Sequence, residues 1–360
     1  MQRSKVLLIS GASPNRAPYL CQYIEILEKH HIDYDVIYQD YEEDTPYEAD
    51  KHYICYPYRY NIHWPLLKKA YKTLGFCKYA TSFVNDEYKL VIIFTIQQII
   101  LSSLFIRQRR IPVIFDIRDY SPIMRFPIVA RCLKNLIKSS VFTAISSRGF
   151  LQWLPDSNKY LLSHNITKAK LEQNNDYDVM YTLDKPPYEI LTIGQIRDYE
   201  ANREIIDILG NNEKFIVKFA GFGAAYNELR QYATDLSNII FTGRYNKTDE
   251  TKIIQKCDFV NIYLGEDVNS RTLTSNRFYN ALLMRKPMIV RSDTYQAQII
   301  KSYNLGVVIS SANELLEKLE FFSSQFDRTK FNENCKTLIE SISSDIRLFE
   351  KTFIDKFSQI

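Results

Sequence analysis

The chain has 360 residues, of which 46% are hydrophobic and 24% charged, a composition typical of a folded protein of about two domains. Basic and acidic residues nearly balance, 46 against 42, and this net charge of +4 lacks the concentrated positive charge that duplex binding needs, so we expect no nucleic-acid partner. The six cysteines form no Cys-x-x-Cys pair, which argues against a zinc site or a disulfide framework and fits a reducing compartment.

The apolar stretch at the N-terminus is too short for the core of a signal peptide and continues into a predicted strand. No run reaches the roughly 18 apolar residues of a spanning helix, and the nearest, residues 90–106, is interrupted by polar side chains. We therefore expect a cytoplasmic protein whose contact with the inner membrane surface is at most peripheral. Basic and aromatic residues interleave in 66–79, 105–110 and 131–138, a pattern that fits both a helix resting on anionic lipid and an ordinary amphipathic helix with solvated lysines.

Short β-branched runs alternate with longer helical patterns along the whole chain, which is typical of βα units and parallel sheets. In the first half this pattern predicts a doubly wound, Rossmann-like domain over residues 1–168. Its predicted strands are 6–9, 34–38, 90–95, 112–116, 141–144 and 160–162, and its predicted helices are 19–30, 65–83, 97–109 and 123–138. Residues 40–60, rich in Tyr and acidic side chains, show no clear pattern.

Apolar periodicity disappears in residues 169–187, which are rich in Asn, Asp, Lys and Pro and which we predict to be a linker. A second α/β domain is predicted over residues 188–330. Its predicted strands are 190–193, 215–220, 239–242, 259–263, 288–290 and 307–309. Residues 331–360 carry apolar side chains at helical spacing and predict one amphipathic helix.

Three segments of the second half place glycines or polar residues at strand ends or helix starts. ILTIGQIR ends a strand at Gly194 and is followed by Arg197; FIVKFAGFG ends in Gly221 and Gly223; and SNRFYNALLMRKP opens a helix at Asn276. The Gly-x-Gly lacks the third glycine of the dinucleotide fingerprint, which argues against a nicotinamide enzyme.

Taken in this order, the segments resemble the nucleotide-sugar-binding domain of retaining GT-B glycosyltransferases. They look most like the bacterial enzymes, family-4-like, that build capsular, O-antigen and exopolysaccharide repeats. The resemblance covers residues 188–309 well and the first half more loosely. It implies two Rossmann-like α/β domains with a cleft between them, and a final helix that crosses back to pack toward the first domain. It also implies transfer of a sugar from a nucleoside-diphosphate sugar to a glycan or polyprenyl-linked acceptor, with retention of configuration and without a cofactor.

The resemblance assigns the donor to the second domain. It implies that Arg197 stabilises the leaving diphosphate. The implied donor-binding residues are Gly194, Arg197, Gly221, Gly223, Asn276, Arg277 and Asn280. Many relatives carry two glutamates eight positions apart, where this chain has Thr272 and Asn280. The nearby Glu266 and Asp267 are candidates to replace them, and we include Glu266 among the donor-binding residues.

In the first domain, polar residues follow two strands at the sheet edge where α/β proteins bind ligands. Ser13, Asn15 and Arg16 follow the first strand, and the FDIRD segment places Asp116, Arg118 and Asp119 after another. We predict that Ser13, Asn15, Arg16 and Arg118 face the acceptor. Asp116 or Asp119 would then accept the hydroxyl proton or orient the acceptor. The alternatives are a solvated loop and an Asp-Arg pair that caps the next helix.

No group of His, Asp or Glu has metal-ligand spacing, so we predict no bound divalent ion. Two other functions remain open. A GT-B-fold sugar-nucleotide epimerase would need carboxylates and a histidine in the cleft, a set that this sequence does not show. A catalytically silent GT-B partner protein is compatible with the missing glutamates.

Overall fold

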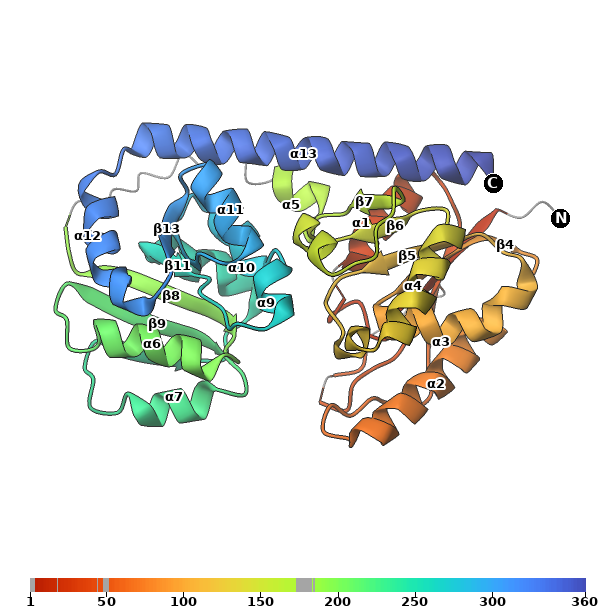
Figure 1. The fold of residues 1–360 in the computed structure, drawn as a ribbon, viewed down its shortest axis with the longest axis horizontal. Helices are drawn as coiled ribbons and strands as arrows, with labels where there is room; N and C mark the ends of the chain where they lie inside the picture. Colours follow the sequence, from red (N-terminus) through yellow and green to blue (C-terminus); the bar gives the residue numbers. More distant parts are fainter. Residues whose placement is uncertain (1–3, 18, 44, 48–51, 173–182, 184) are drawn as a thin grey trace. The chain divides into compact units, whose positions relative to one another are not determined.

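The computed structural model describes residues 4–17, 19–43, 45–47, 52–172, 183 and 185–360. The chain divides into two compact units. Unit 1 comprises Met1–Thr167 and Ser344–Ile360, and unit 2 comprises Lys168–Ser343. Each unit contains one parallel sheet with helices around it (Figure 1). Most of the predicted linker, residues 173–182 and 184, lies outside the described residues.

Unit 1 has a seven-stranded sheet in the order β3-β2-β1-β4-β5-β6-β7. The strands are β1 (Lys5–Ile9), β2 (Tyr34–Tyr38), β3 (Tyr53–Cys55), β4 (Tyr88–Phe94), β5 (Val113–Ile117), β6 (Thr143–Ile145) and β7 (Tyr160–Leu162). The helices are α1 (Tyr19–Lys29), α2 (Leu66–Ser82), α3 (Ile96–Ile106) and α4 (Pro127–Ser139), with 3-10 turns η1 (Arg107–Arg109), η2 (Pro122–Arg125) and η3 (Arg148–Gln152). Each predicted strand overlaps an observed one, and β3 is an additional strand that the sequence did not indicate.

Unit 2 has a six-stranded sheet in the order β10-β9-β8-β11-β12-β13. The strands are β8 (Tyr188–Gln195), β9 (Phe215–Phe222), β10 (Ile239–Gly243), β11 (Phe259–Asn261), β12 (Met288–Arg291) and β13 (Gly306–Ile309). The helices are α5 (Lys168–Glu172), α6 (Tyr199–Leu209), α7 (Tyr226–Tyr232), α8 (Glu250–Lys256), α9 (Val268–Thr272), α10 (Asn276–Leu283), α11 (Tyr295–Ser302) and α12 (Leu315–Ser324), with 3-10 turns η4 (Lys247–Asp249) and η5 (Ala312–Glu314). All six predicted strands of this half are confirmed.

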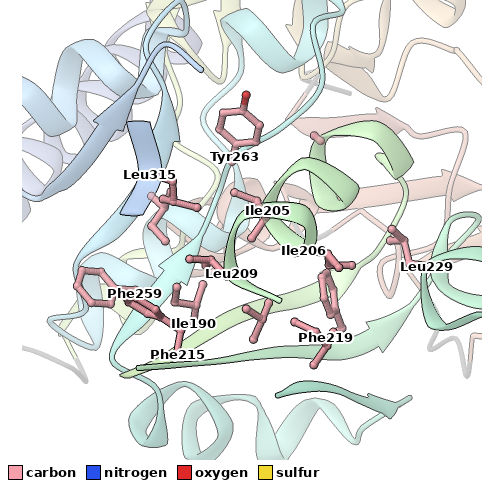
Figure 2. Packing of buried hydrophobic residues seen from close by; sticks show 14 of the residues in the cluster. Ile190, Ile205, Ile206, Leu209, Phe215, Phe219, Leu229, Phe259, Tyr263 and Leu315 are labelled. Carbon is pink, nitrogen blue, oxygen red and sulfur yellow. The ribbon is translucent and has the colours of Figure 1, made fainter. Parts of the chain in front are cut away.

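The core of unit 2 lies between its sheet and the helices beside it. Figure 2 shows side chains of α6, including Ile205 and Leu209, packed toward Phe215 and Phe219 of β9. All four of these side chains are buried. Strands of a parallel sheet are covered on both faces, which is why they appear in the sequence as nearly continuous apolar runs.

The C-terminal helix α13 runs from Arg328 to Gln359, starting three residues before the predicted boundary. The structure divides it, because its residues up to Ser343 belong to unit 2 and those from Ser344 belong to unit 1. In unit 1, Phe349 and Phe353 pack edge-to-face against Tyr23 of α1. The prediction that the whole helix packs toward the first domain therefore describes its second half only.

Strand order also locates the ligand-binding edge of each sheet. The chain proceeds outward in both directions from β1 in unit 1 and from β8 in unit 2. The switch points therefore lie between β1 and β4 and between β8 and β11. In open α/β sheets, ligands bind at the carboxyl ends of the strands at such points.

Candidate active site

Three glycines allow the ends of β8 and β9 to approach closely in unit 2. Gly194 has φ 90° and is paired in register with Gly221, whose φ is 134°. A Cβ atom on Gly221 would lie 1.9 Å from the Gly194 carbonyl oxygen, and one on Gly223 would lie 2.3 Å from the Ile196 carbonyl oxygen. Only glycine fits these positions, because side chains would collide with backbone. The result is a tight turn after β8 at the switch point.

Arg277 connects the start of α10 to this turn. Its Nε donates a hydrogen bond to the Ile193 carbonyl oxygen at 2.6 Å, and its Nη2 donates one to the Gln195 carbonyl oxygen at 2.6 Å. Burial lowers the pKa of Arg277 to about 10, Asp198 opposes that shift, and Arg197 adds to it. The guanidinium is therefore charged at neutral pH and fixed in orientation.

Arg197 lies in the loop between β8 and α6, and its side chain is exposed. Its charge acts on Arg277 and also on Asp267, in the loop after β11. Two guanidinium groups thus share the carboxyl edge of β8. The two positive charges repel each other when no anion is present. A bound anion would be attracted by both and would relieve that repulsion.

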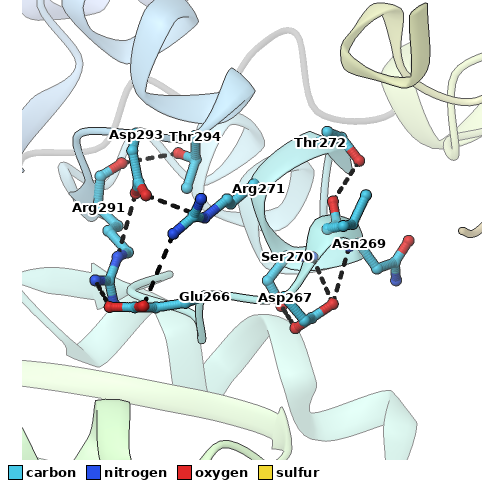
Figure 3. Close-up of polar contacts among 10 residues, drawn as sticks. Glu266, Asp267, Asn269, Ser270, Arg271, Thr272, Arg291, Asp293 and Thr294 are labelled. Carbon is cyan, nitrogen blue, oxygen red and sulfur yellow. Dashed lines mark hydrogen bonds and ion pairs between the residues drawn. The ribbon is translucent and has the colours of Figure 1, made fainter. Parts of the chain in front are cut away.

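The loop after β11 holds Asp267, which the sequence suggested as a substitute carboxylate. Asp267 caps α9 and accepts hydrogen bonds from the amides of Asn269 and Ser270, at 2.9 and 3.1 Å, and from the Ser270 hydroxyl at 2.5 Å (Figure 3). Although burial acts to raise it, these hydrogen bonds lower the pKa of Asp267. Thr272, at the first glutamate position, is buried and donates its hydroxyl to the Val268 carbonyl oxygen.

Glu266 belongs to a ring of four charged side chains (Figure 3). It forms an ion pair with Arg291 and lies 3.7 Å from Arg271. Asp293 closes the ring, pairing with Arg291 at 3.2 Å and with Arg271 at 3.1 Å. The Glu266 side chain is 64% exposed, but two arginines already balance its charge. The ring fixes the loop after β11 against the end of β12.

Asn280, at the second glutamate position, is buried and uses both ends of its amide within unit 2. Lys170 donates to Asn280 Oδ1 at 2.7 Å, and Asn280 Nδ2 donates to Glu250 Oε2 at 3.2 Å. Glu250 Oε1 also accepts from the Tyr245 hydroxyl at 2.8 Å and from Lys247 at 2.5 Å. Burial lowers the pKa of Lys170, while Glu250 opposes that shift. This polar cluster was missed by sequence reasoning.

The polar cluster borders the Gly194 turn. The Tyr245 hydroxyl lies 4.0 Å from the position of a Cβ atom on Gly194. Tyr245 also acts electrostatically on Arg277. Asn276 stands one helical turn before Asn280 but is exposed at the start of α10, so the two asparagines occupy different environments.

In unit 1, Asp116 and Arg118 form a buried ion pair. Asp116 Oδ1 accepts from Arg118 Nε, and Oδ2 accepts from Arg118 Nη2 and from the Tyr23 hydroxyl, both at 2.6 Å. Arg118 also donates to the carbonyl and hydroxyl oxygens of Ser163 after β7, at 3.0 and 2.8 Å. Both residues are buried. The pair therefore joins β5 to α1 and to the end of β7 rather than capping the next helix.

The other predicted acceptor-side residues, Ser13, Asn15 and Arg16, lie in the loop after β1, and the candidate acid Asp119 lies in the loop after β5. Ser13 is buried, and its carbonyl oxygen accepts hydrogen bonds from the amides of Arg16 and Ala17. Arg16 stacks on the Tyr41 ring at 4.2 Å. Asn15, in the same turn, is exposed, as is Asp119 after β5.

Two residues at the switch point of unit 1 gave no signal in the sequence. Gln98 Oε1 accepts a hydrogen bond from the Gly11 amide at 3.2 Å, and this side chain fills the space where a Gly11 Cβ would lie. Thr95, at the start of α3, has φ 64° and ψ 146°. A β-branched residue rarely adopts this conformation, and such strain is concentrated at functional sites.

Within the described part of the chain, no three His, Cys, Asp or Glu side chains are grouped so that they could hold a metal ion. Among the same residues, no helix is long and apolar enough to cross a membrane.

No protein-family model matches the chain, and no curated protein matches it by sequence. Solved structures do resemble it. Sucrose-phosphate synthase from Thermosynechococcus elongatus has a TM-score of 0.75 at 12% identity, over 99% of this chain and 100% of that one. The Anabaena HepE protein in complex with UDP-glucose has a TM-score of 0.66 at 14% identity, and the lipopolysaccharide outer core galactosyltransferase WaaB 0.65 at 10%, each over 99% of this chain and 100% of the other. At such identities the likeness establishes the fold, and the predicted GT-B fold of two Rossmann-like units is confirmed.

Proposed function

We propose that the chain is a glycosyltransferase that moves a sugar from a nucleoside-diphosphate sugar to an acceptor hydroxyl. The observation that carries this proposal is the pair of arginines at the Gly194 turn. Arg277 is fixed by two carbonyl oxygens of β8, and Arg197 is exposed beside it. A fixed guanidinium and an exposed one at the carboxyl end of the same strand suit a diphosphate, whose negative charge grows as the sugar leaves.

The comparisons support the same donor chemistry. HepE was crystallised with UDP, with UDP-glucose, and with UDP and glucose. We propose Gly194, Gly221 and Gly223 as the backbone frame of the donor site, with Arg197, Arg277 and the exposed Asn276 as its polar contacts. Glu266 orients the loop after β11 through its arginine partners. Asn280 acts as a positioning residue, because its amide is already engaged by Lys170 and Glu250.

We propose that the acceptor binds unit 1 at the edge that carries Asn15, Arg16 and Asp119. Of the two candidate acids, Asp119 is the exposed one. Asp116 is held by Arg118 and Tyr23, so we assign Asp116 and Arg118 to the frame of this edge. A glycan or polyprenyl-linked acceptor in surface polysaccharide synthesis fits the WaaB likeness. We also propose that the sugar keeps its configuration, as the resemblance to retaining GT-B enzymes implies. We further propose catalysis without a divalent ion, because the arginines supply the positive charge.

The test compares Arg197→Ala with Arg203→Ala, a matched control on the surface of α6 in the same unit. Calorimetric titration with UDP, GDP and their sugars identifies the donor. Arg197→Ala should then weaken donor binding or slow transfer by about 1.5 to 3 kcal/mol, as expected for a charge-assisted contact. Arg203→Ala should have no effect, and EDTA should leave transfer intact. Equal kinetics for wild type and Arg197→Ala would remove Arg197 from the site.

The same assay distinguishes the two alternatives. Release of nucleoside diphosphate that depends on a lipid extract or glycan acceptor supports transfer. Interconversion of sugar nucleotides without net transfer would indicate an epimerase. Donor binding without turnover would indicate a catalytically silent partner protein.

A further inference from the structure

A cavity in unit 1 lies at the amino edge of the sheet, away from the edge that carries the proposed acceptor residues. Its volume is about 440 Å³, which falls in the range of small-molecule sites, roughly 300 to 1,000 Å³. Helices α3 and α4 pack against each other (Figure 1), and both begin near the carboxyl edge because α3 follows β4 and α4 follows β5. The cavity is formed where these two helices end and β5 begins.

The inner wall of this cavity is apolar. Strand β5 contributes Val113 and Phe115, and the two helices contribute Ile106 and Leu136. Ile106 and Phe115 are buried, whereas Val113 and Leu136 are partly exposed. Covering such a wall with a compact apolar group removes apolar surface from water, which is favourable. The wall therefore suits the body of an organic molecule better than a lone inorganic ion.

The rim of the cavity carries two arginines. The chain leaves α3 through η1 and turns at Arg110, which is left-handed with φ 49° and ψ 30°, a conformation that is uncommon for residues other than glycine. Arg107 and Arg110, on either side of this turn, both line the cavity and are exposed. Arg109 lies between them in sequence but donates instead to the Val84 carbonyl oxygen. Two of the three arginines are thus available to one ligand.

The surroundings of the cavity favour an anion. Among the described residues that line it, none is acidic. No Asp or Glu occurs in residues 96–115 or 120–155, the stretches that carry α3, η1 and α4, although the whole chain has 42 acidic residues against 46 basic ones. Asn135 and Ser139 of α4 add neutral hydrogen-bonding groups to the lining. The charge of the rim therefore complements a negatively charged ligand.

We propose that this cavity binds a small, soluble organic anion. The apolar body of the ligand covers Val113, Phe115 and Leu136, and its anionic group lies between Arg107 and Arg110. A guanidinium can donate two parallel hydrogen bonds to a carboxylate, sulfonate or phosphate group. The inference is independent of the proposed sugar transfer, because the residues proposed for the donor and the acceptor lie at the carboxyl edges of the two sheets.

The test uses anilinonaphthalene sulfonate, an aromatic anion whose fluorescence rises in apolar surroundings. Titration of the full chain should give a dissociation constant of about 10 to 100 µM, as expected for a ligand of this size. Phenylnaphthylamine has the same aromatic body without the sulfonate, and it should bind about tenfold more weakly or worse.

Three variants locate the probe. Arg107→Ala, Arg110→Ala should lose about tenfold or more in affinity, because it removes both charged contacts. Cys132→Phe keeps both arginines but fills part of the cavity from α4, so it should also weaken binding. The matched control, Arg131→Ala, Lys134→Ala, removes two charges from exposed positions of α4 outside the lining and should bind as the wild type does.

Melting curves check the folding of each variant and should not change, because Arg107, Arg110 and Cys132 are exposed. UDP should not displace the probe, since we propose that the nucleotide binds unit 2. Displacement by UDP, equal binding of phenylnaphthylamine, or undiminished binding by the double arginine variant would overturn the proposal. Undiminished binding by Cys132→Phe would place the probe outside the cavity and overturn it as well. Failure of the wild type to bind any nucleotide would speak against the donor site and not against this cavity.

Discussion

Replacing Asn280 by alanine tests whether this residue binds the donor or supports unit 2. The substitution removes two hydrogen bonds, from Lys170 to Oδ1 and from Nδ2 to Glu250, and each has a charged partner. Hydrogen bonds to charged groups contribute about 1.5 to 3 kcal/mol each, but the two share one side chain and are not additive. We therefore expect a loss of about 2 to 4 kcal/mol in the free energy of unfolding, or a melting temperature lowered by roughly 5 to 10 °C.

Thermal melts of the free protein measure this loss, and Asn227→Ala, an exposed asparagine of α7, is the control that should melt like the wild type. Asn280→Asp has nearly the same volume, so it separates charge from packing. It should be destabilising because it places a second carboxylate beside Glu250, and Glu250→Gln in the same chain should recover part of the loss. An unchanged melting temperature for Asn280→Ala, together with weaker donor binding, would refute the structural role and restore the direct donor contact.

Three further substitutions test which contacts stabilise the two units. Gly221→Ala should lower the free energy of unfolding by about 3 kcal/mol or more, because its Cβ would lie 1.9 Å from the Gly194 carbonyl oxygen at a φ of 134°. Denaturant unfolding measures this loss against Gly265→Ala, where the nearest atom to the new Cβ would be 3.3 Å away. Equal losses for the two variants would contradict the prediction. Asp116→Asn should cost about 3 to 5 kcal/mol by leaving the buried Arg118 without its carboxylate, and a melting curve like that of the wild type would refute the ion pair. Hydrogen bonding from His164 and the charge of Arg148 lower the pKa of Asp345, so its carboxylate stabilises the folded state above about pH 4 and loses that effect as the pH falls further. Asp345→Asn should therefore melt below the wild type at pH 7 and approach it near pH 3, and a difference independent of pH would contradict this.

The sheets were predictable from sequence because their strands are buried on both faces and form continuous apolar runs between helical patterns. Strand β3 was not, because it has three residues, is at most half-buried and lies at the edge of the sheet in a Tyr-rich segment. The glycines and arginines at strand ends and helix starts could be picked out because backbone geometry puts such residues there. The polar cluster could not, since its contacts to Asn280 join residues separated by 30 and 110 positions.

The contacts of Arg277 give a physical reason why the end of β8 and the start of α10, which are far apart in sequence, lie together in the fold. Its two hydrogen bonds to β8 span 84 and 82 residues, so the helix that begins at Asn276 is attached to the turn that follows Ile193. A guanidinium has five N–H donors in one plane, and fixing Nε and Nη2 on backbone carbonyls also fixes the direction of Nη1. Lysine could not replace it, because a single ammonium cannot hold that plane. The Gly194 turn, which depends on the close approach of Gly221, sets the positions of the carbonyls that Arg277 contacts. A change at any of these three residues should therefore displace the same positive charge, although none of the three is near the others in sequence.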